Sequence, residues 1–493
     1  MAGDVRNLAD LVRSAAAATP DKPALAGADR SLTWAELDRE VGALAGALRT
    51  RGLHEGDRVG VLLPNSIAFA TTYFAVLRAG LVAVPLNTAY TEPELQHQLA
   101  DSGASLVVTD DSHRELLEGT TLVAGSDDWR EGLAHEPFTE ASTGSEDLAV
   151  LLYTSGTTGR PKGAMLSHRA LLANLEQLSR IEPRVVAPDD VVLLVLPLFH
   201  VYGLNAGLGM TARAGATGVI AERFDPVETL DLVRRHKVTN VIGAPPMYVA
   251  WSLLPDLGDA MSSLRLAVSG AAPLAPELLA AFRETTGHTI YEGYGLTETA
   301  PVLTTTLCSD EAKPGSIGRA VPGVQIRLVD DAGDEADADD PGEITVRGAN
   351  VFSGYWPDGE GGADADGWFR TGDIAYADPD GDLFLVDRLR ELILVSGFNV
   401  YPREVEDALL TNPDIAEVAV IGVPHPYTGE TVKALVVARD GSSLTARDVI
   451  DHAAARLARF KCPTSVEFVD QLPHAVTGKV AKGKLREPFD AAS

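Results

Sequence analysis

The stretch that decides the fold of this chain reads Tyr153-Thr154-Ser155-Gly156-Thr157-Thr158-Gly159-Arg160-Pro161-Lys162-Gly163. It follows an apolar run, residues 148–152, that predicts a buried strand. Glycine lets the backbone approach a ligand and present successive N–H groups, hydroxyls add donors, and Lys162 adds a positive charge. The stretch therefore predicts a cradle for a polyphosphate, although its spacing differs from the usual phosphate loop, G-x-x-x-x-G-K-S/T. Taken alone, a Gly/Ser/Thr stretch is more often a solvated turn.

The bulk composition is that of a globular protein of two to four domains, with 493 residues, 45% hydrophobic and 23% charged. A formal net charge of -29 argues against nucleic acid or an anionic membrane as a partner. Cys308 and Cys462 lie far apart and outside any C-x-x-C spacing, so we expect no disulfide scaffold, no zinc site and a reducing compartment. No leader peptide and no transmembrane run is recognisable, and we expect a cytoplasmic protein.

The order of expected elements predicts an α/β protein whose large N-terminal part has parallel-rich sheets flanked by helices. Asn65 is expected to cap a helix that runs to Arg78, and residues 110–145 are expected to form an irregular surface excursion. From about residue 315 to 387, short strand-like runs between Gly/Asp/Pro turns predict a β-rich subdomain. After residue 390 the pattern predicts a compact α+β unit of about a hundred residues.

Two further constellations suggest nucleotide chemistry. In Tyr291-Glu292-Gly293-Tyr294-Gly295-Leu296-Thr297-Glu298-Thr299, Glu298 offers the carboxylate that Mg²⁺ prefers and Thr297 offers a donor to phosphate. The alternative is a helix start capped by Thr297. In Gly367-Trp368-Phe369-Arg370-Thr371-Gly372-Asp373, Asp373 can accept from two ribose hydroxyls, and an Asx-type turn is the alternative.

Together these motifs carry a family resemblance that covers nearly the whole chain. The sequence resembles the adenylate-forming superfamily of acyl- and aryl-CoA synthetases, peptide-synthetase adenylation domains and beetle luciferases, and is most similar to fatty-acyl-CoA ligases. The segments that carry the resemblance, in order, are 153–163, 294–299, Gly354-Tyr355-Trp356, Thr371-Gly372-Asp373, Asp387-Arg388 and Pro473 with Thr477-Gly478-Lys479.

The resemblance implies an N-terminal adenylation domain at 1–387, a hinge at 388–390 and a mobile C-terminal lid at 391–493. It implies that a carboxylate attacks the α-phosphate of MgATP to give acyl-AMP and pyrophosphate, and that a thiol then displaces AMP. It assigns the β- and γ-phosphates to Thr154, Ser155, Gly156, Thr157, Thr158 and Lys162. It assigns the adenine to Gly270, Ala271, Ala272 and Pro273, the base and acyl channel to Glu292, Gly293 and Tyr294, the α-phosphate to Thr297, Mg²⁺ to Glu298, and the ribose to Asp373 and Arg388.

The same resemblance makes Lys479 the catalytic cation and Arg390 the hinge residue, where Lys or Asp is common. A cation between the carboxylate and the α-phosphate would stabilise the transition state more than the ground state, because charge builds up between two anions. The tail departs from the family pattern at His474 and Ala475, where Arg and a small polar residue are common.

The substrate is expected to be a monocarboxylate with an apolar tail. Segment 196–203 resembles the acyl-pocket wall of the CoA ligases, so we place His200, Val201 and Tyr202 in that pocket, together with Gly295. No Asp occurs between 197 and 208 to bind an α-amino group, and Gly293 replaces the arginine of malonyl-type enzymes. A second carboxylate would therefore be buried unpaired, which is costly. Medium- or long-chain fatty acids are the first expectation, and aryl acids of the 4-coumarate type are the alternative.

Coenzyme A is the expected thiol, because Ser396, Gly397 and Phe398 resemble the loop beside the CoA channel. The expected cofactors are thus ATP, Mg²⁺ and coenzyme A as co-substrate, and a homodimer stays open. Three rivals stay open as well: an acyl-AMP ligase that loads an acyl carrier protein, a catalytically dead acyl-nucleotide sensor, and a luciferase-like oxygenase.

Overall fold

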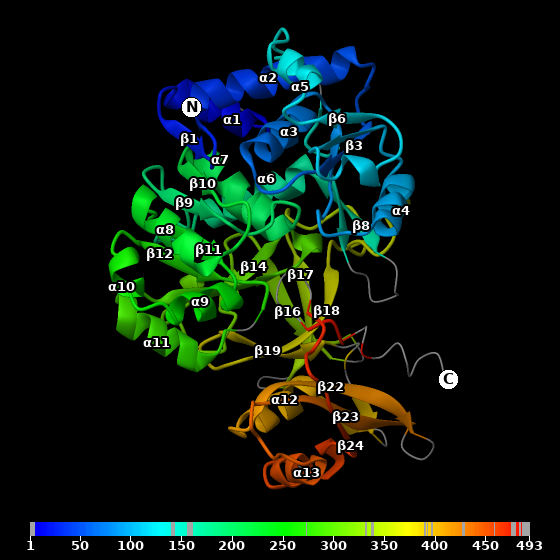
Figure 1. The fold of residues 1–493 in the computed structure, drawn as a ribbon. Helices are drawn as coiled ribbons and strands as arrows, with labels where there is room; N and C mark the ends of the chain where they lie inside the picture. The colour runs from blue at the N-terminus through cyan, green and yellow to red at the C-terminus, as the bar shows by residue number, and fades with distance from the viewer. Residues whose placement is uncertain are drawn as a thin grey trace. The chain divides into compact units, whose positions relative to one another are not determined.

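The computed structural model divides the chain into two compact units, Met1–Gln325 with Arg347–Phe369, and Ile326–Val346 with Arg370–Ser493 (Figure 1). The described residues are 5–139, 143–154, 161–272, 274–330, 333–336, 340–388, 391, 393–395, 398–425, 429–457, 459–474, 480–482 and 485. The predicted hinge at 388–390 and the domain boundary beside it stay predictions.

The larger sheet of the first unit is parallel at its centre. The pairs β1–β10, β10–β9, β9–β11, β11–β12 and β12–β13 are all parallel, and antiparallel strands close both edges. Within the described residues it holds nine strands, in the order β15 (Arg319–Ala320), β14 (Val302–Thr305), β13 (Ile290–Gly295), β12 (Leu266–Ser269), β11 (Asn240–Gly243), β9 (Val191–Leu194), β10 (Thr217–Ile220), β1 (Pro23–Ala26) and β2 (Ser31–Thr33).

The second sheet of this unit carries the stretch that opened the sequence analysis. Its described part has six strands, in the order β6 (Thr121–Val123), β5 (Leu106–Thr109), β3 (Arg58–Leu62), β4 (Val82–Pro85), β7 (Leu148–Thr154) and β8 (Lys162–Ser167). All neighbours are parallel except β7 and β8, which form an antiparallel pair. The predicted strand at 148–152 is therefore confirmed, and it extends to Thr154.

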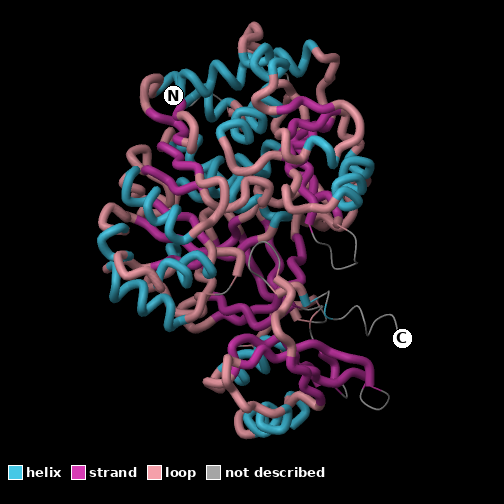
Figure 2. Tube along the Cα trace, viewed as in Figure 1, coloured by secondary structure: helices cyan, strands magenta, loops and turns pink. Residues whose placement is uncertain are grey.

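Helices alternate with strands through the first unit (Figure 2). They are α1 (Asp10–Ala18), α2 (Trp34–Thr50), α3 (Ile67–Arg78), α4 (Glu92–Ser102), α5 (Asp127–Leu133), α6 (His168–Ser179), α7 (Met210–Ala214), α8 (Pro226–His236), α9 (Pro245–Ser252), α10 (Leu257–Ala260) and α11 (Pro276–Thr286). Shorter 3-10 turns are η1 (Arg114–Leu116), η3 (Thr297–Thr299) and η4 (Thr306–Cys308), and η2 (Tyr202–Gly209) is a π-helix.

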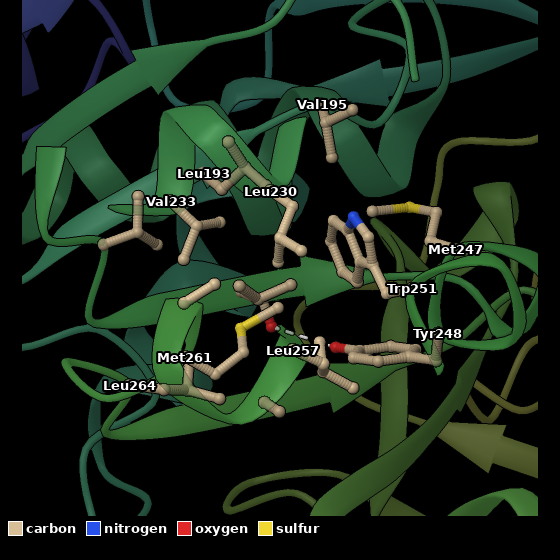
Figure 3. Packing of buried hydrophobic residues seen from close by; sticks show 14 of the residues in the cluster. Leu193, Val195, Leu230, Val233, Met247, Tyr248, Trp251, Leu257, Met261 and Leu264 are labelled. Carbon is tan, nitrogen blue, oxygen red and sulfur yellow. Dashed lines mark hydrogen bonds between the residues drawn. The ribbon is translucent and has the colours of Figure 1, made fainter. Parts of the chain in front are cut away.

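A buried cluster joins α8 to α11 with the larger sheet. Trp251 and Tyr248 are fully buried, and Tyr248 meets Trp251 and Phe282 edge-on, with ring centroids 5.7 and 5.4 Å away. Figure 3 shows Trp251 lying between Leu230 and Met247. The Tyr248 hydroxyl donates to Val268 O on β12 at 2.8 Å. Close packing of this kind holds the sheet against helices α8 to α11, so the carboxyl ends of its strands are held in place.

The second unit contains two antiparallel-rich sheets. One has the order β16 (Gln325–Val329), β17 (Gly342–Arg347), β18 (Phe369–Ala377) and β19 (Leu383–Arg388). The other joins β21 (Phe398–Val400), β20 (Ile393–Val395), β23 (Gly429–Ala438) and β22 (Ile415–His425), with β24 (Ser465–Phe468) parallel to β23. Its helices are α12 (Pro402–Leu410) and α13 (Ala446–Ala454), with a 3-10 turn η5 (Arg459–Lys461). The predicted fold class, α/β with a β-rich part and a small α+β part, is confirmed.

Two local predictions are wrong. Ser66, not Asn65, caps α3, because its hydroxyl accepts the Phe69 N–H at 3.1 Å. The Asn65 amide instead donates to Leu196 O and accepts from Leu198 N–H, at 2.9 and 2.8 Å, and so ties this corner to the segment after β9.

Region 110–145 is also more regular than predicted, since it contains η1, β6 and α5. Ser126 caps α5, and Trp129 anchors that helix with 4% of its surface exposed. These elements are too short to show a clear hydrophobic period in the sequence. Among the described residues, no helix combines the length and the apolar content needed to cross a bilayer.

His168, the first residue of α6, makes the stability of the first unit depend on pH. Burial lowers its pKa from 6.5 to about 4, and its Nδ1 accepts the Leu8 N–H at 3.2 Å. Above pH 6.5 both folded and unfolded chains carry a neutral imidazole. As the pH falls toward 4, the unfolded chain takes up a proton that the folded chain does not, so stability is lost.

We therefore expect His168 to reduce the free energy of unfolding by about 2 kcal/mol between pH 7 and pH 5. Denaturant unfolding of the wild type and of His168→Asn at both pH values measures this contribution. Because asparagine can still accept the Leu8 N–H but does not titrate, the variant should lose that part of the pH dependence. An equal pH dependence in both proteins would contradict the assignment.

Candidate functional site

The predicted phosphate cradle is the connection of an antiparallel hairpin. Thr154, at the end of β7, pairs with Lys162, at the start of β8, and the Thr154 hydroxyl lies 3.5 Å from Lys162 O. Residues 155–160 join these two ends, so Ser155, Gly156, Thr157 and Thr158 lie outside the described residues. Lys162 is exposed. Both described ends of the cradle are thus held by strand pairing at one edge of the six-stranded sheet.

The segment Gly354-Tyr355-Trp356 pairs with β8, at the same edge of the six-stranded sheet. Tyr355 forms an antiparallel bridge with Ala164, the Met165 N–H donates to Gly354 O at 3.0 Å, and the Trp356 N–H donates to Gly163 O at 2.8 Å. The pairing places the Tyr355 ring centroid 5.3 Å from the Lys162 ammonium nitrogen, within cation–π range. This motif was recognised in the sequence, but no role was assigned to its tyrosine.

Glu298 lies on η3, just after β13, and Tyr355 orients it. The Tyr355 hydroxyl donates to Glu298 Oε1 at 2.6 Å, and the Phe352 N–H donates to Glu298 O at 2.9 Å. This side-chain hydrogen bond engages Oε1 of the Glu298 carboxylate. A single oriented carboxylate is what Mg²⁺ uses when phosphate oxygens and water complete its shell. The residues therefore fit a magnesium ion, with Tyr355 as the outer partner that fixes its ligand.

The predicted adenine and base segments meet at the carboxyl ends of neighbouring parallel strands. Ser269 of β12 pairs with Glu292 of β13, so Gly270–Ala272 leave β12 at the point where residues 293–294 of β13 continue in the sheet, paired with β14. Glu292 is 6% exposed, and its Oε2 accepts the Leu274 N–H at 3.1 Å. Glu292 therefore holds the turn in place. Pro273, predicted to line the adenine, lies outside the described residues.

Two residues of this region show why small side chains occur there. Ala271 has φ 69°, a left-handed conformation that alanine seldom adopts and that concentrates at ligand sites. A Cβ on Gly295 would lie 1.9 Å from Pro301 O, so only glycine fits where β13 passes the next loop. Open α/β sheets bind ligands beyond the carboxyl ends of their strands, which is where these residues lie.

Three of the predicted acyl-pocket residues, 200–202, lie at the start of the π-helix η2, which begins at Tyr202. Val201 is buried, His200 is half-buried, and His200 Nδ1 accepts the Tyr202 N–H at 3.2 Å. The Tyr202 ring lies against the backbone after β12, since a Cβ on Gly270 would lie 3.0 Å from its Cε1, its Cζ and its hydroxyl oxygen. Tyr202 is 9% exposed and its hydroxyl has no hydrogen-bond partner among the described residues. Burial raises its pKa, so the hydroxyl stays protonated.

The predicted ribose ligand Asp373 belongs to the second unit. It is 6% exposed and follows Gly372, which has φ 75°. The turn is fixed by Glu343, whose carboxylate accepts the Gly372 N–H at 3.0 Å and the Arg370 Nε–H at 2.6 Å. Asp373 pairs with Arg388 through the backbone of β18 and β19. Glu343 was missed in the sequence, where it reads as an ordinary strand residue.

Several predicted site residues cannot be placed. Arg390, Ser396, Gly397 and Lys479 lie outside the described residues, as do the side chains of Arg388 and Phe398. The segments that flank Lys479 are described: Val480 bridges to His474, and the Ala481 N–H donates to Pro473 O at 2.7 Å. Their roles as hinge, CoA-binding residues and catalytic lysine stay predictions.

The fold and the first unit define a class of protein. Parallel strands that end in a turn of small residues, a hairpin with a lysine at its base, and an oriented carboxylate fit an enzyme that binds a nucleotide. Family models agree: residues 12–356 match the AMP-binding enzyme family and residues 404–479 match the AMP-binding enzyme C-terminal domain. The chain belongs to this family of adenylate-forming enzymes.

Named relatives narrow the class to ligases. A feruloyl-CoA synthase from an Amycolatopsis species is 40% identical, with 96% of each chain covered. A long-chain-fatty-acid–CoA ligase from Bacillus subtilis is 35% identical over 98% of this chain and 94% of its own. The crystal structure of ATP-bound MatB from Rhodopseudomonas palustris superposes with a TM-score of 0.92 at 36% identity, with 99% of each chain covered. The chain is accordingly an AMP-forming acid–thiol ligase of the acyl- and aryl-CoA synthetase type.

Proposed function

We propose that this protein ligates an aryl acid bearing a polar ring substituent, such as a hydroxycinnamate, to coenzyme A at the expense of ATP. The observation that supports the proposal is the Tyr202 hydroxyl, which is buried without a partner among the described residues. A buried hydroxyl left unsatisfied costs roughly 1–3 kcal/mol. A ring hydroxyl on the acid would give the Tyr202 hydroxyl its partner.

The chemistry assigns a task to each part of the site. An oxygen of the substrate carboxylate forms a bond to the α-phosphorus, the bond from that phosphorus to the bridging oxygen breaks, and pyrophosphate leaves. The thiolate sulfur of CoA then bonds to the acyl carbon, the bond from that carbon to the phosphate oxygen breaks, and AMP leaves. Lys162 and the hydroxyls that begin at Thr154 would hold the β- and γ-phosphates. Mg²⁺, bound through Glu298, would neutralise phosphate charge as a Lewis acid.

The remaining assignments are proposals of the same kind. Gly270–Ala272 would lie against the adenine, Thr297 would donate to the α-phosphate, and Asp373 and Arg388 would bind the ribose. The turn geometry supports the adenine assignment, because Glu292 fixes it in the left-handed form that Ala271 shows. The cytoplasmic location and the homodimer stay predictions.

Medium- and long-chain fatty acids are the second candidate substrates. The observation that favours them is Gly293. This glycine leaves the channel without a side chain at the position where malonyl-type enzymes carry an arginine. A Cβ there would meet its nearest atom, Thr304 O, at 3.5 Å, so the position has room. An alkyl tail would need that room and would not satisfy Tyr202.

Removal of the Tyr202 hydroxyl tests the choice between aryl acids and fatty acids as substrates. We expect Tyr202→Phe to lower the preference for 4-hydroxycinnamate over cinnamate, measured as the ratio of kcat/KM, by about five- to tenfold, the worth of one neutral hydrogen bond. Rates with cinnamate itself should change little. Pyrophosphate release and CoA-thioester formation should be followed with both acids and with octanoate and palmitate.

Tyr248→Phe is the matched control. Tyr248 is fully buried, and its hydroxyl already donates to Val268 O. Its loss should reduce stability and leave the ratio of the two cinnamates unchanged. A wild type that prefers octanoate or palmitate to both cinnamates would establish the second candidate instead. Thioester formed only with a holo acyl carrier protein, and not with CoA, would contradict both.

A further inference from the structure

Three buried amide side chains hold the backbone of the loop that follows Glu298. Asn350 donates to Thr299 O at 2.8 Å, and Asn205 donates to Ala300 O at 2.7 Å. Asn174 donates to Val302 O at 2.8 Å and accepts the Val302 N–H at 3.1 Å. All three asparagines are 0% exposed. Buried backbone groups must find partners, so this loop depends on the three amides for its position.

Asn205 differs from the other two amides because it lies on the π-helix η2, which begins at Tyr202. Its two amide hydrogens go to Ala300 O and, at 3.1 Å, to Leu171 O on α6. Gly209 makes room for the amide, since a Cβ there would lie 2.8 Å from Asn205 Oδ1. The Asn205 side chain thus joins three segments. They are η2, which would form the wall of the acyl pocket, α6, and the loop 299–302 that follows the proposed metal ligand Glu298.

The acceptor of this bond is itself in a conformation that needs support. Ala300 has φ 65°, in the left-handed region that alanine rarely adopts, and it lies two residues after Glu298. A π-helix is also an unusual element, found most often at functional sites, and it differs from an α-helix by one residue in its hydrogen-bonding register. Both ends of the Asn205–Ala300 bond therefore lie on backbone of unusual conformation, a π-helix at one end and a left-handed alanine at the other.

We propose that Asn205 is a positioning residue that couples occupancy of the acyl pocket to the placement of Glu298, so that the acid and the metal–nucleotide bind cooperatively. A tail that packs against Tyr202 fixes η2; fixed η2 holds the Asn205 amide on Ala300 O; and the held loop keeps Glu298 aligned with Tyr355. The coupling is reciprocal, so each ligand tightens the other by the same factor. The inference rests on the proposed function of this site as the place where acid and MgATP meet.

The test measures coupling rather than turnover. The affinity of α,β-methylene-ATP with Mg²⁺ is determined by calorimetry with and without saturating 4-hydroxycinnamate, and again with octanoate. We expect one acid to tighten the nucleotide at least about fivefold in the wild type, at the lower end of ordinary couplings. In Asn205→Ser, which lacks the two donors, the ratio should fall below about twofold.

Asn240→Ser is the matched control. Asn240 on β11 is likewise 0% exposed, and its amide donates to Val185 O. If buried amides contribute only stability, both variants lose stability and both keep the wild-type ratio, which would overturn the proposal. If Asn240→Ser keeps the ratio and Asn205→Ser loses it, the coupling runs through Asn205.

A second measurement keeps the proposal testable should Asn205→Ser fail to fold. Amide hydrogen exchange of the wild type, with MgATP analogue absent, should slow in residues 296–302 when the acid is added. Unchanged exchange in that loop would overturn the proposal. Failure of the proposed function is separate from either result, because it appears as a wild type that releases no pyrophosphate with any of the acids.

Discussion

Lys479→Ala is expected to abolish acyl-AMP formation and to leave thioester formation from supplied acyl-AMP nearly intact. The α-phosphoryl transition state gathers negative charge while a second anion, the carboxylate, approaches it. A lysine placed between the two stabilises that state more than the ground state, and loss of one such group typically costs 10²- to 10³-fold in rate. The second half-reaction has no such pair of anions, because its nucleophile attacks a carbonyl carbon.

The measurement is a comparison of two rates in the same variant. Acid-dependent pyrophosphate release reports the first half-reaction, and AMP release from synthetic acyl-AMP with CoA reports the second. Lys461→Ala is a suitable control, since Lys461 pairs with Glu404 at 2.6 Å on the α+β part of the second unit. Loss of that partly exposed pair should cost at most about 1 kcal/mol of stability. It should leave the rates of both half-reactions unchanged. Equal loss of both half-reactions in Lys479→Ala would remove Lys479 from its assigned role.

Glu298→Gln is expected to raise the Mg²⁺ concentration at half-maximal pyrophosphate release by at least about 100-fold. The amide keeps the shape of the side chain but removes the negative charge that a hard cation needs. Tyr355→Phe should have a smaller effect in the same direction, about tenfold, because it removes only the hydrogen bond at 2.6 Å that orients the carboxylate.

Glu228→Gln supplies the comparison, because Glu228 is exposed on α8 and lies outside the proposed site. Its metal dependence should equal that of the wild type. Binding of Mn²⁺ in the presence of ATP, followed by electron paramagnetic resonance, gives a readout independent of turnover. An unchanged Mg²⁺ requirement in Glu298→Gln would exclude Glu298 as the metal ligand, and an effect of Tyr355→Phe larger than that of Glu298→Gln would reverse their order of importance.

Hydrophobic pattern predicted most of the fold, because strands buried on both faces read as continuous apolar runs. The predicted strand at 148–152 lies within β7, and the predicted helix that runs to Arg78 is α3, which ends at that residue. The hydrophobic pattern did not predict the elements that are short or irregular. The π-helix at 202–209 is apolar except for Asn205, so its sequence shows no polar helical face, and β6 and α5 are too short for a period to develop.

The candidate site could be predicted where polar or charged residues lie next to the end of a strand in the sequence. Such residues are Thr154, Lys162, Glu292 and Glu298. The supporting residues could not be predicted, because their partners are distant along the chain. Tyr355 reaches Glu298 only after its segment pairs with β8, and Asn205 reaches Ala300 only after η2 packs beside the loop. A polar side chain in an otherwise apolar run, as in Leu204-Asn205-Ala206, was the one signal that could have indicated a buried hydrogen-bonding role.

The central claim is that the hairpin from Thr154 to Lys162 cradles the triphosphate while Glu298 holds its metal. A crystal structure with Mg²⁺ and a non-hydrolysable ATP analogue tests this most directly. We predict β- and γ-phosphate oxygens within hydrogen-bond distance of residues 154–162 and a magnesium ion on the Glu298 carboxylate. A triphosphate bound elsewhere on the protein, or a metal ion without Glu298 among its ligands, would contradict the account.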